Sequence, residues 1–222
     1  MKTVKEAASY NALRLFSALT HGIGAYLSSV AAAVLITRAV FVEGVWHVVS
    51  FALYSATLIA LYSASTLYHS IPAKPAGRTR LRKLDHIMIF LLIAGTYTPI
   101  CLVTLRAYSA AWGWAIFGVV WGFAAGGTLM KLLWLDAPRW LYTAVYLGMG
   151  WLVVVAIFPL SRAANATTLA LLGAGGAFYT AGAILYALQR PGRENPLFGF
   201  HEVFHIFVIA GSVCHFVMMF FL

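Results

Sequence analysis

Residues 200–221 read FHEVFHIFVIAGSVCHFVMMFF, an apolar run that is long enough to cross a membrane as a helix. Near its start, His201 and His205 stand four positions apart. Four residues are slightly more than one helical turn, so both imidazoles project from the same face and can reach one metal ion together. Ionisable side chains within a membrane are rare and usually functional. The stretch therefore predicts a membrane helix that carries half of a metal site.

The whole chain has the composition of an integral membrane protein. Of its 222 residues, 62% are hydrophobic and only 9% are charged, whereas a soluble domain carries about 25% charged residues. We expect an all-α, seven-transmembrane-helix bundle, a single domain over residues 1–222 with a short tail at 1–16. A cleaved signal peptide is disfavoured, because the first apolar run is too long and begins too far in. The seven predicted spans are residues 17–38, 46–70, 86–105, 110–131, 139–158, 166–189 and 200–221.

The net charge of +9 is distributed unevenly between the two sides of these spans. One side holds Lys2, Lys5, Arg14, Lys74, Arg78, Arg80, Arg82, Lys83, Lys131, Arg139, Arg190 and Arg193. The other side holds only Arg38, Arg106 and Arg162. The positive-inside rule then predicts a cytoplasmic N-terminus and an external C-terminus, in a multi-pass protein of the cell inner (plasma) membrane. The basic cluster at 74–83 is typical of contact with anionic lipid headgroups. We expect no nucleic-acid partner, because aromatic residues do not interleave with this cluster.

Topology brings further polar residues to the layer of the two histidines. The second span runs toward the cytoplasmic side and ends at His69, and His21 lies early in the first span. Asp85 and His86 are expected to open the third span from the same side. Most of the histidines therefore converge on one leaflet by topology alone, whereas His47 and His215 lie toward the other.

Neutral imidazole suits zinc, and three protein ligands plus a water molecule form the open arrangement of a catalytic zinc site. His69, His201 and His205 are the candidate ligands. Asp85 is the best-placed carboxylate to orient a ligand or accept a proton from the water. Ser65 stands one turn before His69 on the same helix face and can donate a hydrogen bond there.

Two other groups have simpler interpretations. Cys101 and Cys214 both lie within predicted spans and are expected to be small buried side chains. Gly118, Gly122 and Gly126 form a small-residue stripe that lets helices approach closely. That contact can lie within the chain or between copies of it, which leaves a homo-oligomer open.

The chain resembles the hemolysin III proteins, the bacterial branch of the progestin and adipoQ receptor superfamily. The resemblance covers nearly the whole chain and rests on four motifs in the family's order: residues 20–24 (THGIG), 65–69 (STLYH), 85–86 (DH) and 201–205 (HEVFH). It implies a seven-helix bundle with a cytoplasmic N-terminus. It also implies zinc bound by His69, His201 and His205, Asp85 associated with the zinc-bound water, and Ser65 near the metal.

One motif departs from the family's pattern. The family's first motif usually reads Glu-x-x-Asn-x-x-x-His, but the matching positions here are Arg14, Ser17 and His21. A role that depends on that Glu or Asn does not transfer to this chain.

Four functions fit the sequence. The first is a zinc-dependent hydrolase, related to amidohydrolases by the resemblance, in which Asp85 activates water, Ser65 steadies the oxyanion and the substrate is a lipid amide or ester at the cytoplasmic leaflet. The second is a membrane sensor or regulator of membrane homeostasis, with structural zinc and no turnover. A zincin that uses Glu202 as its base is the third. A pore-forming hemolysin is the fourth.

Overall fold

The structure is a computed structural model that describes residues 13–192, 195 and 198–222. Within these residues every regular element is helical, and seven helices are long and apolar enough to cross a membrane. The predicted all-α, seven-span membrane bundle is confirmed. The predicted tail, 1–16, lies outside the described residues up to position 12. The observed spans are Leu15–Glu43, Val45–Ser70, Pro75–Tyr108, Ala110–Leu133, Trp140–Ala163, Ala166–Leu188 and Phe200–Phe221.

Several spans consist of more than one helical segment. The α-helices are α2 (Leu15–Arg38), α3 (Val45–Ser70), α4 (Pro75–Pro99), α5 (Arg106–Tyr108), α6 (Ala110–Leu133), α7 (Arg139–Gly150), α8 (Ile157–Ala163), α9 (Ala166–Leu188) and α10 (Phe200–Met218). A π-helical segment, Ile100–Leu105, follows Pro99 and joins α4 to α5. A 3₁₀ segment, Trp151–Ala156, joins α7 to α8. These irregular turns keep each span continuous where proline or glycine interrupts the α-helix.

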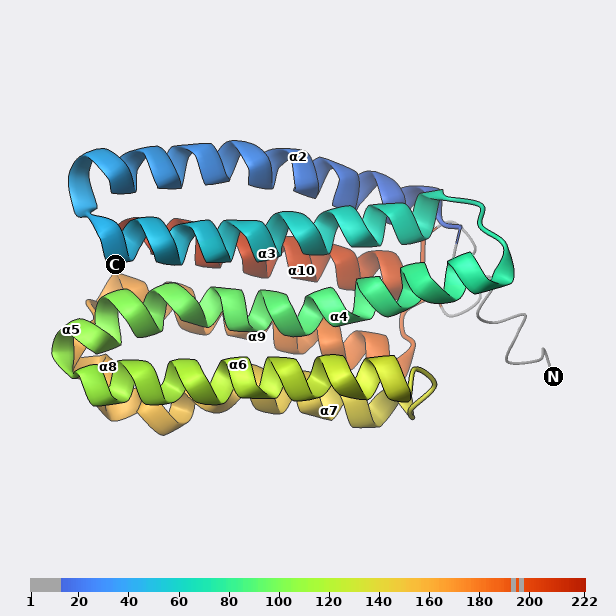
Figure 1. Ribbon diagram of the computed structural model, residues 1–222. Helices are drawn as coiled ribbons and strands as arrows, with labels where there is room; N and C mark the ends of the chain where they lie inside the picture. The colour runs from blue at the N-terminus through green and yellow to red at the C-terminus, as the bar shows by residue number, and fades with distance from the viewer. Residues whose placement is uncertain (1–12, 193–194, 196–197) are drawn as a thin grey trace.

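Consecutive spans run antiparallel and form a closed bundle, because α10 packs against both α9 and α2 (Figure 1). The end where α3 finishes and α10 begins is called the histidine end, since His69, His201 and His205 lie there. The other end, where α5 and α8 lie, is called the opposite end. α2 begins at the histidine end and the chain finishes at the opposite end.

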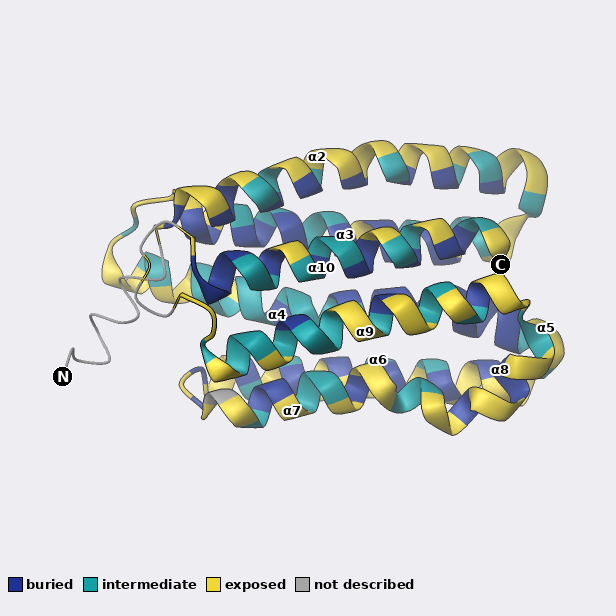
Figure 2. Cartoon of the chain, turned by 180° about the vertical axis from the view of Figure 1, so that it is seen from behind, coloured by how far each residue is buried: buried dark blue, intermediate teal, exposed yellow. Residues whose placement is uncertain are grey.

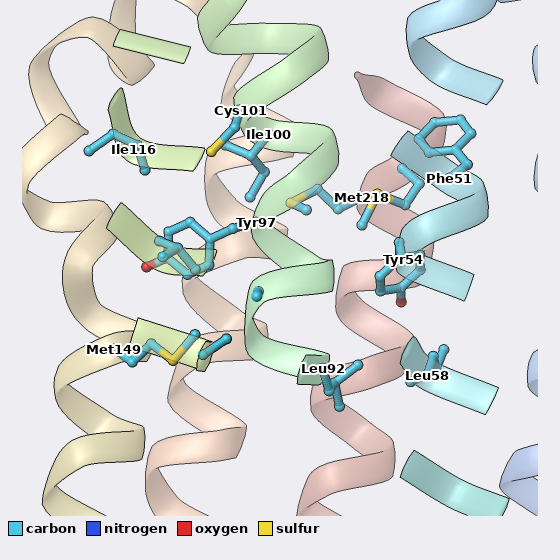
Figure 3. Close-up of a cluster of buried hydrophobic side chains, with 14 of the residues drawn as sticks. Phe51, Tyr54, Leu58, Leu92, Tyr97, Ile100, Cys101, Ile116, Met149 and Met218 are labelled. Atoms are coloured by element: carbon cyan, nitrogen blue, oxygen red, sulfur yellow. The ribbon is translucent and has the colours of Figure 1, made fainter. Parts of the chain in front are cut away.

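The core lies between α3, α4 and α10. Figure 3 shows Phe51, Tyr54 and Leu58 of α3 facing this region together with Leu92 of α4 and Met218 of α10. The third span is the most enclosed, with 72% of its apolar window buried, against 17% for the first. Figure 2 shows that the outward faces of the peripheral helices are largely exposed, and their side chains are apolar because lipid surrounds them. Cys101 is buried in this core, and Cys214 is half-buried.

The third helix begins earlier than predicted, at Pro75 instead of residue 86. Pro75 occupies the first turn, where the missing N–H costs nothing, and the basic residues that follow are good helix formers. These turns extend past the neighbouring helices at the histidine end (Figure 1). Asp85 therefore does not open the helix but lies about three turns inside it.

The glycine stripe of α6 is not used for packing within the described chain. Gly118, Gly122 and Gly126 are exposed, and a Cβ atom at any of them would meet nothing within 4 Å. Gly127, by contrast, is buried against the ring of Phe90 in α4. The close approach of α6 to α4 thus depends on the glycine next to the stripe.

We predict opposite effects for two neighbouring substitutions in α6. Gly127→Ala would push a methyl group into the Phe90 ring and lower the free energy of unfolding by about 1–3 kcal/mol. Gly126→Ala meets open space, so its effect should stay within about 0.5 kcal/mol. Thermal unfolding of both variants in one detergent tests this, and equal melting temperatures would contradict it.

Candidate metal site

Three histidines from two helices meet at the histidine end. His69 belongs to the last turn of α3, and His201 and His205 belong to the first two turns of α10. All three are buried, and their potential ligand nitrogens lie within 4.8 Å of one another. The Nε2 atoms of His69 and His201 are 3.1 Å apart. The structure thus brings together the three histidines that the sequence singled out.

This arrangement fits a tetrahedral zinc ion. Nitrogens bound at about 2.0–2.1 Å to such an ion lie about 3.4 Å from each other, so only small movements would close the triangle. Three buried imidazoles therefore form a donor set that a divalent metal could occupy.

A fourth imidazole covers this group without joining it. The ring of His21 stacks on that of His205, with centroids 3.5 Å apart and planes inclined by 8°. The ring of Tyr62 makes a T-shaped contact with that of His21, with centroids 4.9 Å apart. The ring of His86 lies 5.8 Å from that of Tyr142, between centroids. Of the residues predicted for this layer, His21 therefore packs directly on one candidate ligand, His205.

Asp85 and Ser65 form a second polar pair at this end. Ser65 is buried in α3, one turn before His69, and its side chain hydrogen-bonds the half-buried carboxyl group of Asp85 in α4. The carboxyl group of Asp85 is not part of the group of three potential ligands. The pair therefore lies at the histidine end without contributing to the group of three histidines.

Glu202 is fully buried, and both of its carboxylate oxygens are engaged. Arg14 forms an ion pair with it, with Nε 2.7 Å from Oε1 and Nη2 2.7 Å from Oε2. The Ser17 hydroxyl donates to Oε1 at 2.7 Å, and the Gly199 N–H donates to Oε2 at 2.8 Å. Because three hydrogen bonds and the ion pair with Arg14 occupy this carboxylate, the zincin interpretation loses its general base.

Arg14 also donates hydrogen bonds to two backbone carbonyls at the histidine end. Its backbone N–H donates to the carbonyl of His69 at 3.2 Å, and Nη2 donates to the carbonyl of Asn195 at 3.1 Å. One buried arginine thus ties the start of α2 to the end of α3 and the start of α10. Arg14 belongs to the short predicted tail at 1–16, and the structure buries it, with only 4% of the residue exposed.

Sequence reasoning missed this ion pair, although a signal was present. A carboxylate at the first turn of a membrane helix needs a cation, and Arg14 and Ser17 are the two positions that depart from the family's first motif. Their common partner is Glu202. The departure from the motif and the buried acid are therefore two parts of one contact.

Comparison with known proteins gives a consistent assignment. The model of the family described as "Haemolysin-III related" matches residues 14–216. The chain is similar to Hemolysin-3 of Bacillus cereus, 39% identical over 92% of this chain and 87% of the relative. It is similar to the Hemolysin-3 homolog of Bacillus subtilis (strain 168), 36% identical over 97% of this chain and 93% of the relative. A more distant similarity is to the human monocyte to macrophage differentiation factor, 25% identical over 77% of this chain and 69% of the relative.

We predict that Arg14→Ala lowers the free energy of unfolding by about 3–5 kcal/mol, because it leaves the Glu202 carboxylate buried without its cation. The matched control is Arg82→Ala, which removes an exposed pair with Asp136 at the same end and should cost at most about 1 kcal/mol. Denaturant titration in detergent measures both variants. Similar decreases in the free energy of unfolding would show that the buried ion pair contributes no more to stability than the exposed one.

Proposed function

Because the chain belongs to the Haemolysin-III related family of membrane proteins, we propose that it binds zinc and hydrolyses an amide or ester bond of a membrane lipid. The observation that carries the proposal is the group of three buried imidazoles at His69, His201 and His205. Their donor atoms are of the type that zinc prefers, and three ligands leave a coordination position open for water.

When bound, zinc would supply Lewis-acid activation of water and polarisation of the scissile carbonyl. The protein's own part is to balance charge and move a proton. Glu202 is neutralised by Arg14, and Asp136 by Arg82. Asp85 is thus the carboxylate left at the histidine end, among the described residues, to offset a divalent cation and accept a proton from the attacking water. Ser65 donates to Asp85 and holds its carboxylate in orientation.

The substrate class follows from where the site lies. The histidines are in the terminal turns of membrane spans, so a bond near the glycerol or amide level of a lipid is at a suitable depth. The cationic residues Arg78, Arg80, Arg82 and Lys83 lie at the same end. By the positive-inside rule we propose that this end faces the cytoplasm and that the protein resides in the inner membrane.

A second function has its own support. The histidines and Arg14 together join α2, α3 and α10, which is the geometry of a structural tie. Zinc would then stabilise the bundle of a non-catalytic sensor or regulator of membrane state, since metal binding free energy adds to folding free energy.

We expect wild-type protein purified in detergent to contain about one zinc per chain. His69→Ala should lose more than about 100-fold in zinc affinity, because removing a ligand costs more than removing a supporting contact. His47→Ala is the control, since His47 is a half-buried histidine at the opposite end. Elemental mass spectrometry gives the ratios. A metal-free wild type, or equal zinc in both variants, would refute the site.

Turnover separates the two functions. We expect zinc-loaded wild type to release a free fatty acid from vesicles of total membrane lipid, and Asp85→Asn to reduce the rate by about 10²–10⁴-fold while keeping its zinc. Asp136→Asn, which removes an exposed carboxylate at the same end, should leave the rate unchanged. Lipid mass spectrometry detects the product. Zinc-loaded wild type that yields no product, yet loses thermal stability on chelation, would favour the structural role.

A further inference from the structure

The opposite end of the bundle contains a cavity of about 740 Å³, remote from the histidines. Residues from the ends of five spans line it, together with the last residues of the chain. The lining includes two of the three arginines at this end, Arg106 after α4 and Arg162 in α8. The cavity thus concentrates positive charge where the chain has few cations.

Arg106 is held in position by two contacts. Its guanidinium lies 4.0 Å from the centre of the Trp46 ring, and its Nε donates to the carbonyl of Leu102 at 2.7 Å. Stacking and one Nε bond leave the terminal nitrogens of the guanidinium as donors. Arg162 also lines the cavity, and its guanidinium lies 5.6 Å from the centre of the Phe158 ring. Two arginines therefore line one cavity, and the contacts of Arg106 fix its guanidinium.

The described residues provide no ion-pair partner for these two arginines. Glu43 also lines the cavity, but Arg38, outside the lining, forms an ion pair with it at 2.8 Å. Within the described residues, neither Arg106 nor Arg162 has a carboxylate within ion-pairing distance. Like charges that share a cavity are stabilised by an anion, and the planar guanidinium matches the oxygens of phosphate.

We propose that this cavity binds a phosphate-bearing anion, held by Arg106 and Arg162. Its surroundings favour the headgroup of an anionic phospholipid as the source. Trp46 and Tyr108 line the cavity and are 37% and 50% exposed, as expected of aromatic residues at a membrane–water interface. Val45, also in the lining, is 67% exposed and offers an apolar surface beside the cavity for an acyl chain. The site is independent of zinc, because it lies at the other end of the bundle.

The test measures lipid binding to full-length protein in neutral detergent by the rise in melting temperature. Phosphatidylglycerol, phosphatidylcholine and inorganic phosphate are titrated separately. Phosphatidylglycerol should stabilise the wild type more than phosphatidylcholine does. Arg162→Gln should weaken the apparent affinity about tenfold, and the double variant Arg106→Gln/Arg162→Gln should abolish the preference. Arg80→Gln is the control, because it removes one exposed cation at the histidine end.

The three titrations distinguish a lipid from a soluble anion. Stabilisation by phosphatidylglycerol but not by inorganic phosphate assigns a lipid, and stabilisation by phosphate alone assigns a soluble anion; both support the cavity. The exposed position of Arg162 keeps the single variant informative if the double variant does not fold. An equal response of wild type and Arg162→Gln to every probe would overturn the proposal, as would a wild type that prefers neither anion over phosphatidylcholine.

Discussion

The ion pair between Arg14 and Glu202 is the contact on which the histidine end depends. A carboxylate within the first turn of a membrane helix is tolerated only when its charge and its hydrogen-bonding capacity are both satisfied. Arg14 supplies the charge, while Ser17 and the Gly199 N–H complete the hydrogen bonds. Because Glu202 follows His201 directly, the contact also fixes the turn of α10 from which the candidate ligands project.

The packing of the other helices can be explained by their lipid surroundings. Between apolar helices in lipid there is little hydrophobic driving force, so close packing decides which surfaces meet. α4 shows this, because it is the most enclosed span and approaches α6 through the contact of Phe90 with Gly127. The outward faces carry large apolar side chains. These suit contact with lipid, which does not require the complementary surface shape that helix–helix packing requires.

Much of this architecture could be predicted from the sequence. Apolar runs separated by short polar segments define the seven spans, and their alternating direction places His69, His201 and His205 at one end. Side-chain partners were harder to predict, because periodicity gives a face but not a neighbour. Arg14 precedes the first apolar run, so hydropathy gives no indication that it is buried against Glu202. The start of α4 was also misplaced, because the basic residues after Pro75 reduce hydropathy without preventing helix formation. The cavity at the opposite end had no sequence signal beyond isolated arginines, since it is assembled from residues of several helix ends.

The partnership of residues 14 and 202 has a consequence for how such chains can diverge. The two positions are 188 residues apart, yet neither can change its charge alone without leaving the other unpaired in lipid. A relative with an acidic residue at the first position needs a different partner in its last helix. Substitutions at positions 14 and 202 must therefore occur together. A hybrid protein that takes only its last helix from such a relative would combine two residues at these positions that do not form an ion pair.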